Sequence, residues 1–141
     1  MIQISHNLAE TTRLSLWSLL CLLGMIATGC VPLVQTEDGR SIRANSEEFQ
    51  EYIESVFRRQ NAVSVRLMWA IDGDESEEVL QELERIESRL LDVCRPLNDV
   101  AIARRRHRSI DFDQKRELIQ AAPQCERVTA QTESALRDIG Y

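Results

Sequence analysis

The chain has 141 residues, with 23 acidic and 17 basic side chains and a formal net charge of −6 at neutral pH. This acidic balance argues against a general nucleic-acid-binding protein, because such proteins depend on cationic contacts with phosphates. Only three glycines follow residue 30 and aromatic residues make up 5% of the chain, which argues against an all-β domain with many tight turns.

An uncharged segment near the N-terminus runs from Leu14 to Ala27 and follows a weakly positive start that ends at Arg13. Its length is that of the apolar region of a secretory signal. The segment ends in the sequence ATGC, whose cysteine is Cys30. This end resembles the lipobox of bacterial lipoproteins, although Ala27 stands where leucine is commoner. The resemblance implies that residues 1–29 are a signal peptide and that Cys30 carries lipid, palmitate included, as the mature N-terminus.

Two other interpretations of this segment remain open. The uncharged run continues to Val34, which makes it about twenty residues long, enough for one transmembrane helix. The charges on its flanks would then place the C-terminal part outside the cytoplasm. An ordinary secretory cleavage site is the third interpretation. All three place residues 36–141 in an oxidising compartment, which the lipoprotein resemblance identifies as the periplasm. Val31 is not aspartate, and in lipoproteins of two-membrane bacteria this favours the outer membrane over the inner one.

The cysteine count agrees with export. Cys21 lies inside the signal and Cys30 is the expected lipidation site, which leaves Cys94 and Cys125. An even number of remaining cysteines in an oxidising compartment predicts a disulfide.

Residues 30–45 show no clear hydrophobic period and are interpreted as the lipidated cysteine and a flexible tether. A helical bundle domain is expected over residues 46–141. Its first helix begins after Asn45, which can act as the cap, and ends near Ile71, before the breaker Asp72-Gly73-Asp74. Its apolar positions recur every three or four residues, at Phe49, Ile53, Val56, Val63, Leu67 and Ala70.

Two further helices are predicted. The second starts near Glu75 or Ser76 and ends in the basic run RRRHR, residues 104–108. The third follows a cap at Ser109 or Asp111 and stops at Gly140. The second helix has its apolar stripe at Val79, Leu80, Leu83, Ile86, Leu90, Cys94, Leu97 and Ala101, and the third at Phe112, Leu118, Ala122, Cys125, Val128, Thr132, Leu136 and Ile139.

The cysteines and prolines of these two helices are placed symmetrically. Cys94 and Cys125 have the same midpoint in the sequence as Pro96 and Pro123, and this midpoint falls next to Ser109, in the predicted turn. Residues equally far from the turn of an antiparallel helical hairpin lie at the same level. We therefore expect a disulfide between the cysteines and helix kinks at the prolines. The predicted fold is all-α: an elongated three-helix antiparallel bundle with a disulfide-stapled C-terminal hairpin.

The sequence offers no catalytic constellation. The only histidine after residue 30 is His107, inside the arginine run, and there is neither a CxxC pair nor a phosphate-binding glycine loop. We therefore expect no enzymatic activity, no cofactor, no metal site and no nucleic-acid partner.

Two candidate surfaces remain. Arg104, Arg105, Arg106 and Arg108 form a basic patch expected near anionic lipid headgroups, where it would support the lipid anchor. The alternative is a solvated turn that compensates the helix dipole. Four apolar residues lie off the main stripes and are candidates for binding an envelope partner, or else they widen the core: Tyr52, Phe57, Met68 and Trp69.

The function expected from these features is that of a non-enzymatic envelope lipoprotein acting as a structural or protein-interaction module. One alternative is a small-ligand carrier or inhibitor with a pocket near the helix kinks. Another is a helical periplasmic protein held by a single membrane span. The sequence does not fix the oligomeric state.

Overall fold

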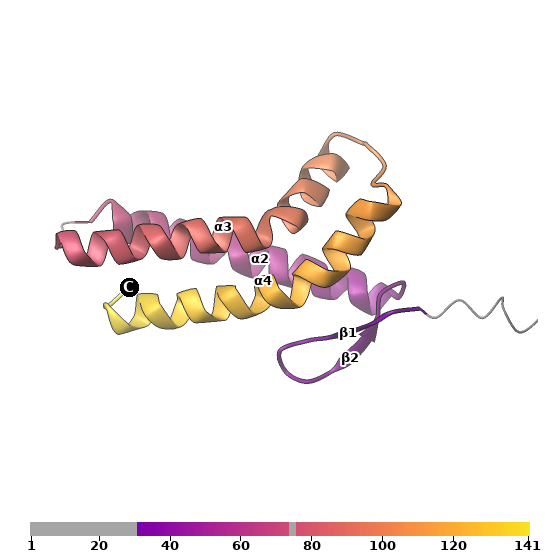
Figure 1. Cartoon of the computed structure of the whole chain (residues 1–141), viewed down its shortest axis with the longest axis horizontal. Coiled ribbons are helices and arrows are strands. Elements are labelled where there is room, and N and C mark those ends of the chain that lie inside the picture. The colour runs from indigo at the N-terminus through magenta and orange to yellow at the C-terminus, as the bar shows by residue number, and fades with distance from the viewer. Residues whose placement is uncertain (1–30, 74–75) are drawn as a thin grey trace, which may run out of the picture. The chain divides into compact units, whose positions relative to one another are not determined.

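The computed structural model describes residues 31–73 and 76–141, and Pro32–Tyr141 form one compact unit. Three long helices dominate this unit. Helix α3 is antiparallel to α2 and to α4, so α2 and α4 run in the same direction (Figure 1). The predicted all-α, three-helix antiparallel bundle is therefore confirmed, with a small β-hairpin added. The elements are β1 (Leu33–Gln35), β2 (Ser41–Arg43), α2 (Glu47–Ile71), α3 (Glu77–Arg105) and α4 (Phe112–Asp138).

Short polar side chains cap each helix at its N-terminus. Ser46 caps α2, one residue after the predicted Asn45, and its side chain accepts a hydrogen bond from the Phe49 backbone. Ser76 caps α3 in the same way. Asp111 caps α4 in a capping box with Gln114, so the two residues satisfy each other's backbone donors. These caps fix where each helix begins and leave only a short turn between α3 and α4.

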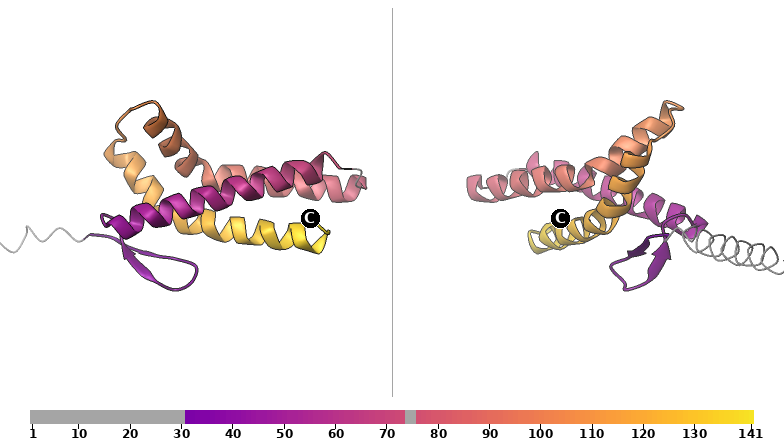
Figure 2. Two further views of the ribbon diagram at one scale, coloured as in Figure 1. Left: turned by 180° about the vertical axis from the view of Figure 1, so that it is seen from behind. Right: turned by 45° about the vertical axis from the view of Figure 1, so that its right-hand side comes forward.

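Helices α3 and α4 bend together part-way along their length (Figures 1 and 2). Pro96 lies inside α3 and Pro123 lies inside α4. Each proline removes one intrahelical hydrogen bond and its ring crowds the preceding turn, which is the usual cause of a kink. Because the two prolines are at equal distance from the turn, both helices change direction at one level and stay paired. The outer turns of the hairpin diverge from the direction of α2.

The segment before α2 is structured, which corrects the prediction of a flexible tether over residues 30–45. Strands β1 and β2 pair antiparallel, with Val34 opposite Ile42, and both side chains are buried. The loop between them turns at Gly39, whose φ of +83° suits glycine. The hairpin therefore adds its two apolar side chains to the core beside α2 and α4.

The core follows the apolar stripes predicted from the sequence. Its largest fully buried side chains include Phe49 and Leu67 of α2, Leu90 of α3 and Leu136 of α4. All three helices therefore contribute to a single cluster, which the β-hairpin closes at the end where α2 begins.

Candidate functional site

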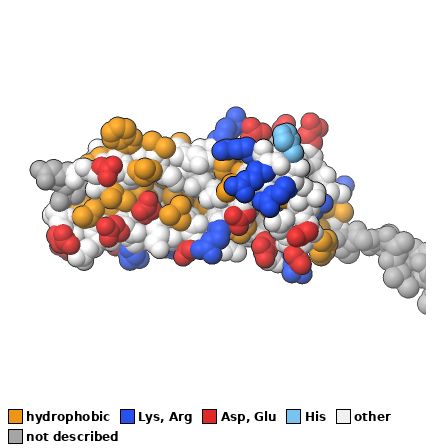
Figure 3. All heavy atoms as spheres, turned by 90° about the horizontal axis from the view of Figure 1, so that it is seen from above, with side chains coloured by type: hydrophobic (Ala, Val, Ile, Leu, Met, Phe, Trp, Pro, Cys, Tyr) orange, Lys and Arg blue, Asp and Glu red, His pale blue; other side chains and the backbone are white. Residues whose placement is uncertain are grey.

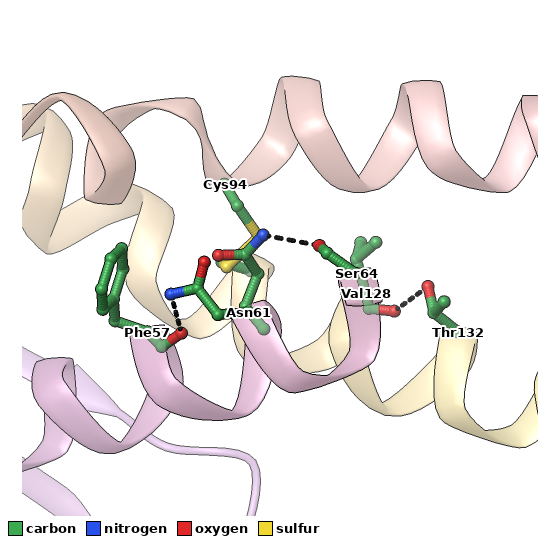
Figure 4. Close-up of a disulfide and its surroundings, with 8 residues drawn as sticks. Phe57, Asn61, Ser64, Cys94, Val128 and Thr132 are labelled. Atoms are coloured by element: carbon green, nitrogen blue, oxygen red, sulfur yellow. Dashed lines mark hydrogen bonds between the residues drawn. A yellow bond between two sulfur atoms is a disulfide. The ribbon is translucent and has the colours of Figure 1, made fainter. Parts of the chain in front are cut away.

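The disulfide predicted from the mirrored cysteines is present. Cys94 of α3 and Cys125 of α4 are bonded, with their Cα atoms 4.9 Å apart, and both residues are fully buried (Figure 4). The bond lies close to the two prolines in sequence, at the level where the helices bend. It therefore fixes α3 to α4 at the bend.

The register of the hairpin also follows the prediction. Leu83 is as far from the turn as Leu136, and Leu97 is as far from it as Ala122. All four residues are buried, as expected for residues that face each other. The fit weakens near the open end of the hairpin, where Ile139 is exposed. The disulfide therefore lies inside a continuous apolar seam, not at an isolated contact.

Polar side chains line the core on both sides of the disulfide. Gln60 of α2 is buried, and its Nε2 donates to Ser64 Oγ at 3.0 Å, while its Oε1 accepts from no described residue. On α4, Thr132 Oγ1 donates to the Val128 carbonyl at 2.9 Å (Figure 4). Thr129 is buried without a partner for its hydroxyl among the described residues. Two buried polar atoms of this part of the chain, Gln60 Oε1 and Thr129 Oγ1, are therefore left without a hydrogen-bond partner among the described residues.

A ladder of polar contacts joins α2 to α4. Tyr52 Oη donates to Glu126 at 2.8 Å, and Arg59 makes two bonds to Glu133, at 2.9 and 2.6 Å. Both pairs are 74 residues apart in sequence, and Tyr52 and Arg59 are separated by two helical turns. Such a constant offset is what two parallel helices in register produce. The ladder was not predicted, because its partners are distant in sequence and each is unremarkable alone.

The ladder shifts the titration of its members. Burial, together with the hydrogen bond to Glu126, raises the pKa of Tyr52 well above its ordinary value. The bidentate contact with Arg59 lowers the pKa of Glu133. The carboxylate of Glu126 also accepts the Glu37 backbone N–H at 3.0 Å, so it links the β-hairpin, α2 and α4. These shifts indicate a structural clamp, because each charged group is paired.

The structure separates the four candidate interaction residues. Tyr52 is buried, so it belongs to the core and the ladder, which is the second of the two possibilities expected for it and excludes it from a partner surface. Phe57 is half-buried. Met68 and Trp69 are 56% and 71% exposed. Val65, which was not among the predicted residues, is also exposed and shares their side of α2, because residues three and four apart are neighbours on a helix surface.

The basic patch lies where α3 ends. Arg104, Arg105, Arg106 and Arg108 are all exposed, and His107 between them has a positive φ of 53° that reverses the chain. Figure 3 shows these cationic side chains gathered beside the histidine, with hydrophobic side chains collected toward the opposite end of the same face. Arg104 contacts Gln50 near the start of α2, whereas Met68 and Trp69 lie in its last turns, so the basic patch and these two apolar residues are well separated on this unit.

Phe112 is another exposed residue that was not predicted to lie at the surface. It was assigned to the apolar stripe of the third helix, but its side chain is 77% exposed. The reason is its position as the first residue of α4, immediately after the cap, on the part of the hairpin that diverges from α2. No helix of the bundle covers that position.

The described residues contain no group of histidine, cysteine and acidic side chains arranged to hold a metal ion. Grooves in this part of the chain include one between α3 and α4 beside Ile86 and Thr132 and one between α2 and α4 beside Ser55 and Thr129. Neither groove is lined by Pro96 or by Pro123. Among the helices described, none combines the length and apolarity that crossing a bilayer requires.

Cys30, the expected lipidation site, lies outside the described residues. Comparison with known proteins supplies no relative: no family model matches the chain, and no curated protein or solved structure matches it significantly.

Proposed function

We propose that this protein is a non-enzymatic lipoprotein of the bacterial envelope, whose disulfide-stapled bundle is held at a membrane and contacts another envelope protein. The observation that carries the proposal is the exposed apolar face of α2, formed by Val65, Met68 and Trp69. A bundle with a sealed core does not need three large apolar side chains on one exposed face.

The position of this face suits a partner protein. It lies in the last two turns of α2, whereas the chain enters the unit at Pro32, beside the first turn of α2 (Figure 1). A helix of this length spans about 35 Å at 1.5 Å per residue. The apolar face is therefore presented far from the point where an anchor at Cys30 would hold the unit.

The spacing of the sequence determines how closely an anchor at Cys30 would hold the folded unit. Only Val31 and Pro32 stand between Cys30 and the first residue of β1. With a lipid on Cys30, the folded unit would begin within about 10 Å of the acylated residue, since an extended chain gains at most 3.3–3.6 Å per residue. Such a short connection holds the bundle against the membrane surface.

Substitution of the exposed tryptophan tests the partner surface. Trp69→Glu is expected to leave the circular dichroism spectrum and the thermal midpoint unchanged, because the side chain is mostly exposed. Site-specific photo-crosslinking from position 68 in cells is expected to yield one discrete adduct in the parent chain and none in Trp69→Glu. Gln131→Glu is the control, because it adds the same charge at an exposed position on α4.

Two results would contradict the partner surface: identical adducts in Trp69→Glu and the parent, or loss of folding in Trp69→Glu. The anchor is tested separately, by mass spectrometry of the mature N-terminus. An acylated Cys30 supports the lipoprotein, whereas an uncleaved N-terminus supports the single-span alternative.

A further inference from the structure

The turn between α3 and α4 concentrates positive charge on an otherwise acidic chain. Residues 102–116, here called the hairpin tip, hold six cationic and two acidic side chains, against a net charge of −6 for the whole chain. One of the acids, Asp111, caps α4, and the other, Asp113, pairs with Arg116 at 3.0 Å. The arginines at 105, 106 and 108 are exposed and form no ion pair among the described residues.

The hairpin tip also exposes apolar side chains beside these arginines. Phe112 is 77% exposed, the highest value among the large hydrophobic residues described, and Ile102 is 43% exposed. Exposed apolar side chains next to cations form an amphipathic surface. It suits the boundary of a bilayer, where cations meet phosphates and apolar side chains reach the acyl chains.

The hairpin tip lies at the end of the unit where the chain enters. Arg104 at its base donates to Gln50 Oε1 at 2.7 Å, and Gln50 lies in the first turns of α2, directly after the β-hairpin. The same end carries the start of β1, where Leu33 is 64% exposed (Figures 1 and 2). A single plane therefore touches the entry of the chain and the hairpin tip.

We propose that the hairpin tip is a second, non-covalent membrane contact that binds anionic phospholipids. Phe112 and Ile102 enter the interface, while Arg105, Arg106 and Arg108 bind lipid phosphates. The disulfide and the two prolines hold the tip at a fixed angle to the bundle, so engagement of the tip sets the orientation of the whole unit. The inference extends the anchoring proposed above, but its test does not require an acyl chain.

The experiment uses residues 32–141, which contain every buried side chain of the described core and both disulfide cysteines. Sedimentation with vesicles of phosphatidylcholine, with and without 30% phosphatidylglycerol, measures the partition. Binding is expected to the anionic vesicles only. The triple variant Arg105→Gln/Arg106→Gln/Arg108→Gln is expected to lower the partition coefficient by roughly 100-fold, at about fivefold per cation.

A matched variant controls for net charge. Arg58→Gln/Arg89→Gln/Arg127→Gln removes the same charge from exposed positions on the three helices. It is expected to keep most of the binding, and a loss as large as that of the tip variant would overturn the assignment of the site.

Insertion of the aromatic ring is measured directly. Trp69 is the only tryptophan of this fragment, so Trp69→Phe/Phe112→Trp places one fluorophore at the tip. A blue shift and quenching by brominated lipid are expected with anionic vesicles, and Phe112→Ser is expected to weaken binding by roughly tenfold. Three results would overturn the proposal: equal binding to neutral and anionic vesicles, an unshifted emission spectrum, or binding to a DNA duplex without binding to vesicles. Binding of the hairpin tip to anionic vesicles, together with an unacylated Cys30, would support this inference and contradict the lipoprotein proposal.

Discussion

Loss of the Cys94–Cys125 bond is the perturbation whose magnitude the structure fixes best. The cysteines are 31 residues apart, and both are fully buried in an apolar seam. On the chain-entropy model, opening a loop of this length lowers the free energy of unfolding by about 4 kcal/mol, because the reduced denatured chain regains its freedom. This is a large share of the 5–15 kcal/mol typical of a small domain.

The assay is urea unfolding of residues 32–141 in two forms. One is the oxidised protein, and the other is protein that has been reduced in the denatured state and refolded in the presence of reductant. The reduced protein is expected to lose about 4 kcal/mol and to show a larger m-value, because its denatured chain is more expanded. Cys94→Ala/Cys125→Ala is the control, since its unfolding must not respond to reductant. A loss smaller than about 1 kcal/mol on reduction would refute the reasoning that the bond stabilises through the unfolded chain.

Three further predictions concern the ladder and the two faces of α2. The pKa of Tyr52 is raised on folding, so this residue contributes fully to the free energy of unfolding below its ordinary pKa near 10 and loses that contribution as the pH rises further. Tyr52→Phe is therefore expected to reduce the fall of the urea midpoint at alkaline pH. The opposite sign holds for Glu133, whose pKa is lowered on folding. Its contribution to the free energy of unfolding is present above its ordinary pKa near 4.5 and is lost as the pH falls below that value. Glu133→Gln is therefore expected to make the urea midpoint less sensitive to acid. Leu67→Ala is expected to cost about 2–5 kcal/mol because the side chain is fully buried, whereas Trp69→Ala on the exposed side is expected to change the free energy of unfolding by less than about 0.5 kcal/mol. Equal losses at these two positions would contradict the orientation of α2.

The hairpin of α3 and α4 was predictable because its information is local. Cap residues fix where the helices start, and the mirrored positions of Cys94 and Cys125 fix how far the chain runs before it returns. The prolines kink the helices as expected, since equal distances from the turn let both bend at one level.

The β-hairpin before α2 was missed for a physical reason. Strands of three residues offer too few positions to establish a period of two, and their stability depends on burial of Val34 and Ile42 against helices elsewhere in the chain. One signal was present: Asp38-Gly39 stands between the two apolar positions, and this dipeptide is typical of hairpin turns.

The surfaces were predicted less well than the core. Tyr52 lies on the edge of its apolar stripe, and its hydrogen-bond partner Glu126 is 74 residues away in the sequence. Phe112 fits the helical period but lies beyond the reach of α2. Periodicity indicates which side of a helix is apolar, but it does not indicate where along the helix a partner stops covering it.

Mass spectrometry of the protein purified from membranes tests the central claim, a folded unit held directly at a lipidated cysteine. One mature species is expected, which begins at Cys30, carries acyl chains on that residue, and shows two free thiols, those of Cys94 and Cys125, only after reduction. An unacylated chain that retains residues 1–29, or a mature species with Cys94 and Cys125 free before reduction, would contradict it.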